Sequence, residues 1–187
     1  MNMEIEGYPV YYYEEITSTM DLAKNLVKEG REGIIVGEVQ TEGRGRYGRK
    51  WLSPRGGLYL SFVLKKSKIT DFLSEIICLS LIETMKNFRI ENCKIKFPND
   101  IIINGRKICG ILIEKDGDFY IIGVGINIKK NKELKENYYI CMEDVSDKKF
   151  EIIDVLRIFL KEFKKIKNLA EKDIDYVLKN WSENLLK

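Results

Sequence analysis

The feature that most constrains the fold is a run of strand-like segments between residues 93 and 128, rich in isoleucine. Polar turn residues interrupt this run at Pro98-Asn99-Asp100, at Asn104-Gly105 and at Asp116-Gly117. Asparagine or aspartate followed by glycine, placed between apolar runs, favours the type I′ turn of a two-residue hairpin. The region is therefore predicted to form an antiparallel meander.

The part of the chain before the meander begins with a strand and a helix. Residues 10–16 are aromatic and β-branched, which is typical of a strand. Ser18-x-x-Asp21 matches a capping box, and the apolar residues after it have helical spacing, so a helix is predicted to begin there. Gly30 is predicted to end this helix as residue C′.

Two further strands, a long helix and a helical tail complete the predicted elements. Residues 33–40 and 57–64 are typical of buried strands, and Thr70 is predicted to cap an apolar helix that runs to residue 88. Residues 150–187 change to helical spacing, with a second helix predicted from Asp173. Strands early and helices late indicate the α+β class.

Composition excludes several classes of chemistry. The chain has no histidine, which removes histidine-based acid–base catalysis, catalytic triads that need it and most zinc enzymes. Its four cysteines are far apart and are predicted to be core thiols rather than disulfides or metal ligands. Catalysis must therefore rely on lysine, arginine, carboxylates and a hard metal ion.

Charge and hydropathy restrict the partners and the location. The 32 basic residues nearly match the 29 acidic ones, and a net charge of +3 does not indicate a nucleic-acid partner. No apolar run approaches the roughly 18 residues that span a bilayer, and the first residues do not resemble a signal peptide. We therefore expect a globular, cytoplasmic protein without a membrane partner.

Residues 41–51, called the arginine loop below, are rich in glycine and arginine. Residues 43–48 match the dinucleotide-binding pattern G-x-G-x-x-G, but Pro54 and a strand follow where that motif needs a helix, so we reject a Rossmann fold. The three arginines, on a backbone made pliable by glycine, suit a phosphate or a carboxylate. A solvated loop and an RNA-binding segment are alternatives. The arginines are Arg44, Arg46 and Arg49.

Three later segments add polar groups to the meander. Residues 96–100 end a strand in a polar turn, and Lys107 begins a strand whose remainder is apolar. A lysine in this position suits a fixed positive charge facing an anion, and a solvated strand end is the alternative. Gly123 and Gly125 interrupt an otherwise apolar strand. Such glycines indicate either the close approach of a ligand or neighbouring backbone, or a β-bulge.

Together, these segments resemble the ordered motifs of biotin protein ligases. The resemblance covers residues 16–128 and rests on residues 43–54, 96–100, 107–114 and 123–127. It implies a class II synthetase-like fold, with a mixed, largely antiparallel sheet flanked by helices. It also implies a reaction of biotin with ATP and Mg²⁺ to give biotinyl-5′-AMP. The biotinyl group would then pass to a lysine of a biotin carboxyl carrier protein.

The resemblance also implies roles for individual residues. Lys107 and Arg44 would supply positive charge for catalysis, Asp100 would receive the proton of the acceptor lysine, and Trp51 would face adenine. Asn99 and Asp100 would lie at the metal and acceptor-lysine end of the site, but no individual metal ligand is assigned. The residues implied around biotin are Ser18, Thr19, Gln40, Gly43, Arg44, Gly45, Arg46, Lys107, Gly110 and Ile111. Those implied around ATP are Arg46, Arg49, Trp51, Asn99, Lys107 and Asn127.

The sequence departs from the family pattern in three ways. Met20 replaces a usual asparagine, Phe97 replaces a usual tryptophan, and helices end the chain where many members add a small β-barrel. We therefore expect residues 1–187 to be a single catalytic domain, with the barrel absent or replaced by helices. No helix-turn-helix precedes the first strand, so no repressor activity is expected. A homodimer is compatible with the resemblance.

Two other functions fit the same residues. One is a lipoate ligase-like enzyme of the same broader superfamily, which competition between lipoate and biotin in adenylation distinguishes. The other is a non-catalytic module that binds biotin, a nucleotide or RNA. Biotin-dependent release of pyrophosphate excludes such a module, whereas salt-sensitive retention of RNA favours it.

Overall fold

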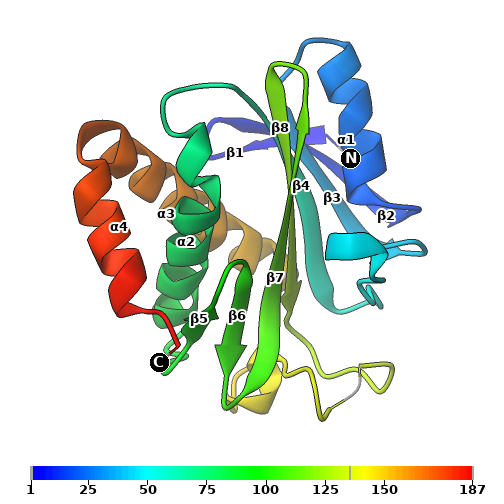
Figure 1. Cartoon of the computed structure of the whole chain (residues 1–187). Coiled ribbons are helices and arrows are strands. Elements are labelled where there is room, and N and C mark those ends of the chain that lie inside the picture. Colours follow the sequence, from blue (N-terminus) through cyan, green and yellow to red (C-terminus); the bar gives the residue numbers. More distant parts are fainter. Residues whose placement is uncertain (1, 135, 187) are drawn as a thin grey trace.

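The computed structural model describes residues 2–134 and 136–186 and contains one eight-stranded sheet in the order β1-β2-β3-β4-β8-β7-β6-β5 (Figure 1). β2 and β3 pair in parallel, because α1 provides the crossover between them, and the other neighbours pair antiparallel. The strands are β1 (Asn2–Ile5), β2 (Tyr8–Ile16), β3 (Gly33–Gln40), β4 (Gly57–Lys65), β5 (Lys94–Lys96), β6 (Asp100–Ile103), β7 (Arg106–Asp116) and β8 (Phe119–Asn127).

Helices cover both faces of the sheet (Figure 1). α1 packs on β3, β4 and β8, α2 and α3 pack on the opposite face, and α4 packs on α2 and α3. On that face Phe163 of α3 lies 4.8 Å from Phe62 of β4, measured between ring centroids. None of the helices in the described ranges is long and apolar enough to cross a membrane. The helices are α1 (Thr19–Lys28), α2 (Leu73–Asn87), α3 (Ile152–Lys172) and α4 (Ile174–Glu183).

The predicted meander is confirmed as β5 to β8, and one of its two predicted turns has the expected geometry. Asn104 and Gly105 have positive φ angles of 50° and 75°, as a type I′ turn requires. The prediction for Asp116-Gly117 was wrong by one residue. Asp116 still pairs with Phe119, so the central turn residues are Gly117 and Asp118, of which only Gly117 has positive φ.

Two predicted helix starts differ from the structure. Ser18 is the N-cap residue of α1, but its buried Oγ has no hydrogen-bond partner among the described residues. Asp21 forms an ion pair with Arg44 instead of completing a capping box. Thr70 donates its hydroxyl to the Ser67 carbonyl and begins a 3₁₀ turn, so the N-cap residue of α2 is Phe72, two residues later than predicted. In both cases a tertiary or turn contact replaces the local cap.

Other predictions about local structure are confirmed. Gly30, with φ of 67°, ends α1, and its N–H and that of Arg31 bond back to the last turn as in a Schellman motif. The arginine loop contains one 3₁₀ turn, Arg46–Gly48, and leads into β4 rather than a helix, which excludes a Rossmann site there. All four cysteines are buried and free.

Candidate active site

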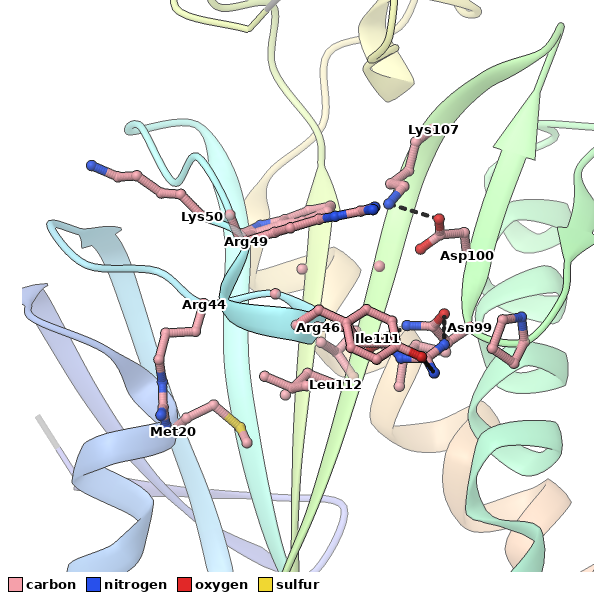
Figure 2. Close-up of a pocket in the computed structure, with 18 of the residues that line it drawn as sticks. Met20, Arg44, Arg46, Arg49, Lys50, Asn99, Asp100, Lys107, Ile111 and Leu112 are labelled. Carbon is pink, nitrogen blue, oxygen red and sulfur yellow. Dashed lines mark hydrogen bonds and ion pairs between the residues drawn. The ribbon is translucent and has the colours of Figure 1, made fainter.

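A cavity of about 340 Å³ opens between the arginine loop and the face of β7 and β8. The turn between β5 and β6 forms another wall, so segments far apart in the sequence meet there (Figure 2). Small-molecule sites have volumes of about 300–1,000 Å³. The cavity therefore has the size that holds one small molecule.

Trp51 covers two glycines in the floor of this cavity. A Cβ atom added to Gly110 would lie 2.7 Å from the indole ring, and one added to Gly125 would lie 2.4 Å from Nε1. The strand register continues through Gly123 and Gly125, so these glycines do not mark a β-bulge. They leave space for Trp51 and, at Gly123, for Met20. The two glycines therefore mark a close approach to the strand and not a β-bulge. The groups that approach are the side chains of Trp51 and Met20.

A chain of hydrogen bonds lines the α1 end of the cavity. Gln40 Oε1 accepts from the Thr19 backbone N–H at 2.8 Å and from its hydroxyl at 3.1 Å. Gln40 Nε2 donates to Ser53 Oγ at 2.8 Å, and Ser61 Oγ donates to Thr19 Oγ1 at 2.7 Å. Because each polar group bonds to the next, the orientations of the Thr19 and Gln40 side chains are fixed. This region suits a neutral polar ligand group.

A lysine–carboxylate pair occupies the other end of the cavity. Lys107 Nζ lies 2.7 Å from Asp100 Oδ2 (Figure 2) and 5.7 Å from the centroid of the Trp51 ring. Asn127 is buried beside β7, where its Nδ2 donates to the Lys107 carbonyl at 3.3 Å. The Asn127 Oδ1 atom has no partner among the described residues. The lysine is therefore held both by its backbone and by its charged group.

A β-bulge sets the direction of Lys107. Along β6 and β7 the pairing changes from Ile101 with Cys109 to Ile102 with Lys107, which leaves Ile108 as the extra residue. A bulge of this kind turns the following side chains relative to a regular ladder. The apolar sequence pattern carries no sign of this register shift.

The arginine loop distributes its charges among different partners. Arg46 donates to Asn99 Oδ1 at 3.0 Å, whereas Arg44 turns towards α1 and lies 2.9 Å from Asp21 (Figure 2). Arg44 also lies 3.7 Å from Glu114. Arg49 has no ion pair with any described residue. Only part of the positive charge of the loop is therefore neutralised by the protein.

Burial keeps the Cys109 thiol and the Tyr59 hydroxyl protonated, so neither is a candidate nucleophile or base. It raises the pKa of the Cys109 thiol well above its ordinary value of 9.0, so this thiol stays protonated and is a poor nucleophile. Burial also raises the pKa of Tyr59 far above its ordinary value of 10.0. The Tyr59 hydroxyl donates to the Pro54 carbonyl at 2.8 Å and anchors the segment that follows the arginine loop.

The structure brings together most of the residues predicted for the site, although their individual roles stay predictions. Ser18, Gly43 and Asn127 do not line the cavity. A Cβ on Gly43 would lie 2.4 Å from the Trp51 carbonyl, so this glycine permits the loop to fold back. Ser61 was not predicted, although a lone serine in an apolar strand could have indicated it. The predicted residues that line the cavity are Thr19, Gln40, Arg44, Gly45, Arg46, Arg49, Trp51, Asn99, Asp100, Lys107, Gly110 and Ile111.

A second cavity of about 220 Å³ shares Tyr139 with the first. Tyr139 packs edge-to-face on Trp51, with ring centroids 6.1 Å apart. Lys130, Lys132 and Asp144 are among the residues around this second space. The two cavities therefore adjoin at one aromatic wall.

The residues fit magnesium only as an ion carried by a phosphate substrate. Of the residues that the structure describes, Asp100 is the one carboxylate that lines the first cavity, and it is paired with Lys107. Within the described ranges no group of three or more Cys, Asp or Glu side chains could hold a metal ion. Mg²⁺ commonly binds through one or two carboxylates together with substrate phosphates. Asn99 and Asp100 could add oxygen ligands to such an ion.

Sequence comparison defines the class of protein that has this fold and cavity. A profile of the Biotin/lipoate A/B protein ligase family matches residues 12–131, well over half of the chain. The chain belongs to the biotin/lipoate A/B protein ligase family.

Individual relatives support this membership and the predicted fold. Bifunctional ligase/repressor BirA of Bacillus spizizenii is 32% identical over 146 residues, which cover 71% of this chain and 44% of that protein. Biotin protein ligase from Aquifex aeolicus in complex with biotin and ATP is 29% identical, with a TM-score of 0.84 over 95% of this chain and 78% of that one. The Leishmania major enzyme in complex with biotin is 27% identical, with a TM-score of 0.83 over 95% and 81%.

These likenesses confirm the predicted α+β fold with a mixed, largely antiparallel sheet flanked by helices. The chain spans less than half the length of the BirA relatives that it matches.

Proposed function

We propose that the chain is a biotin protein ligase, which activates biotin with ATP and transfers it to a lysine of a biotin carboxyl carrier protein. One observation carries this proposal: a single cavity joins a neutral hydrogen-bonding end at Thr19 and Gln40 to a cationic end at Lys107. Biotin has a neutral polar ring system at one end and a carboxylate at the other. The names of the relatives point to the same substrate.

In the first step a biotin carboxylate oxygen attacks the α-phosphorus of ATP, which forms biotinyl-5′-AMP and releases pyrophosphate. This step brings anions together, so it needs positive charge that is already in place. Lys107 would contact the carboxylate and then the adenylate phosphate. Arg46 and Arg49 would bind the phosphates, and Arg44 could join them by leaving Asp21.

In the second step the neutral amine of the acceptor lysine attacks the carbonyl carbon of biotinyl-5′-AMP. The bond to the phosphate oxygen breaks, AMP leaves, and an amide forms. A lysine normally carries a proton at neutral pH, so a base must accept it before the attack. Asp100 is the carboxylate of the cavity and is our candidate for this base.

The adjoining cavity behind Tyr139 offers room for the nucleotide, with Lys130 and Lys132 as further cations. The prediction that Trp51 faces adenine stays open, because Trp51 covers the glycine floor. A single catalytic domain, a homodimer and the lack of a nucleic-acid partner also stay predictions from the sequence.

The direct test is transfer of biotin to a carrier domain. The protein is incubated with ATP, Mg²⁺, biotin and the acceptor domain, and label on the acceptor lysine is measured. Lys107→Ala should reduce the rate about 100-fold or more, the loss typical when one charge-stabilising group is removed from an active site. Lys115→Ala, at the exposed far end of β7, is the matched control and should retain full activity.

Two results would contradict the proposal. The intact protein could transfer no biotin, or Lys107→Ala could be as active as Lys115→Ala. Competition with lipoate in the same assay identifies the preferred acid. Biotin-dependent release of pyrophosphate excludes a module that binds without turnover.

A further inference from the structure

Exposed aromatic side chains gather around the opening of the first cavity. Of the six large hydrophobic side chains that are exposed in the described ranges, three belong to segments at this opening. Tyr47, in the arginine loop, is 84% exposed, and Phe97, in the turn between β5 and β6, is 71% exposed. Tyr138 is 69% exposed, and its carbonyl accepts from the Lys107 backbone N–H at 2.9 Å. We call these three residues the aromatic rim.

Two residues of the aromatic rim make contacts within the protein although they face solvent. The Phe97 ring packs edge-to-face on Trp181 of α4, with centroids 6.3 Å apart. The Arg46 guanidinium lies 5.0 Å from the centre of the Tyr47 ring and donates to its hydroxyl at 2.9 Å. Aromatic groups that are fixed before binding lose little conformational entropy in a complex. Phe97, which packs on a helix, therefore has the properties of an anchor residue in a protein interface.

The charge around the opening is strongly positive. Among the described residues, six cationic side chains line the cavity, against the single carboxylate of Asp100. Arg49, Lys50 and Lys96 have no ion pair with any described residue, and in Figure 2 Lys50 points away from the cavity. Pyrophosphate takes its negative charge away after the first step. The opening is then left with uncompensated positive charge.

We infer that the aromatic rim and the lysines beside it form the docking surface for the biotin acceptor. This inference rests on the proposed function. A lysine side chain has only a four-carbon stem, so the acceptor backbone must come close to the rim for the amine to reach Lys107 and Asp100. The fitting partner is a folded protein whose target lysine has acidic neighbours and an apolar side chain. Its acidic groups would meet Lys96 and Lys50, and its apolar side chain would cover Phe97.

Single-stranded RNA also binds surfaces that combine aromatic rings with basic residues. A protein fits better here, because a net charge of only +3 gives the whole chain little general attraction for a polyanion. The cations gather at one opening that leads to a reactive cavity.

The test separates docking from chemistry. Phe97→Ser and Tyr138→Ser are compared with Tyr176→Ser, an exposed tyrosine of α4 outside the cavity. Each variant is assayed with a biotin carboxyl carrier domain and, separately, with hydroxylamine, a small nucleophile that attacks biotinyl-5′-AMP without docking. We expect Phe97→Ser and Tyr138→Ser to raise KM for the carrier domain about tenfold. For Tyr138→Ser, whose residue does not line the cavity, the kcat at saturating acceptor and the hydroxylamine rate should stay unchanged.

Charge reversal provides a second experiment. Lys96→Glu should raise the KM for the carrier domain and weaken the dependence of this KM on salt concentration. Three outcomes would overturn the inference: an unchanged KM in both aromatic variants, a parallel fall of the hydroxylamine rate in Tyr138→Ser, or tighter salt-sensitive binding of single-stranded RNA than of the carrier domain. If the intact protein forms no adenylate, the proposed function falls and this inference falls with it. If adenylate forms but the rim variants behave like Tyr176→Ser, only this inference fails.

Discussion

At the scale of single residues, the packing of Trp51 on Gly125 determines the shape of the cavity. A Cβ on Gly125 would meet three atoms of the indole within 2.7 Å, so Gly125→Ala must displace the ring. Overpacking of this kind costs about 1–3 kcal/mol. We expect Gly125→Ala to lower the free energy of unfolding by an amount in this range, measured by denaturant titration, and to weaken biotin binding in calorimetry.

A double-mutant cycle provides the control for this prediction. In the Trp51→Ala background the added methyl group has space, so Gly125→Ala should cost little there. Equal costs in both backgrounds would show that Trp51 does not cause the loss.

Individual site residues differ in how well the sequence identifies them. Lys107 and Gln40 were predicted and lie at the two ends of the cavity. Ser18 was predicted for the same site, but its side chain is buried away from the cavity lining. A motif gives the order of residues along the chain, whereas the direction of each side chain depends on the twist and packing of its element. The resemblance therefore identified the segments that form the site better than it identified the side chains that line the cavity.

At the scale of elements, the arginine loop is joined to α1 by exposed side-chain ion pairing. Its Arg44–Asp21 ion pair joins two side chains that are 36% and 44% exposed, so it stabilises the loop by less than about 1 kcal/mol. We expect trypsin to cut the ligand-free protein near Arg46 and Arg49. Saturating biotin and ATP should slow this cutting several-fold, because anions would hold the arginines. Electrophoresis with mass spectrometry identifies the cut sites.

Cutting near Lys65 and Lys66, at the end of β4, serves as the internal reference for protease activity. Equal cutting at the arginine loop with and without ligands would contradict the prediction.

The strands and hairpins were easier to predict than the helix starts. A turn such as Asn104-Gly105 depends on the conformations that two adjacent residues can adopt, and these are local. The start of a helix depends on which group satisfies its first N–H donors, and distant residues compete for that role. Asp21 bonds to Arg44 from the arginine loop and not to its own helix. That competition was not visible in the local pattern.

At the scale of the whole molecule, buried thiols and phenols make the protein sensitive to alkali. Burial raises the pKa of Cys78 from 9.0 to about 12, and that of Tyr8 from 10.0 to about 12. The stabilisation from keeping these groups protonated is fully present below the pKa of the unfolded state. It is lost as the pH rises towards the pKa of the folded state. Stability should therefore fall steadily above pH 9, with no histidine titration near neutral pH.

Denaturant unfolding at a series of pH values between about 8 and 11 measures this effect. Each buried thiol should contribute on the order of 1 kcal/mol per pH unit above its unfolded pKa. Cys78→Ala should lower stability at neutral pH and make the alkaline slope shallower. A slope that does not change in this variant would contradict the prediction.

The protection of one edge of the sheet also depends on the fold of the whole molecule. Next to the short edge strand β5, the Leu186 N–H bonds to the Ile95 carbonyl, and the Ile95 N–H bonds to the Asn184 carbonyl, both at 2.8 Å. The segment after α4 thereby covers backbone groups that a bare edge would expose. The bonded residues are 89 and 91 positions apart, and their sequences give no sign of this pairing.

The sequence by itself determined the α+β class, the meander, the four core cysteines and the set of segments that form the cavity. These features follow from hydrophobic periodicity, turn residues and motif order, which act over short stretches of chain. Only the tertiary structure decided that Trp51 fills the space over Gly110 and Gly125, that a bulge directs Lys107 to Asp100, and that Asp21 bonds to Arg44. These contacts join residues that are distant in sequence, and their formation depends on packing and register across the whole sheet.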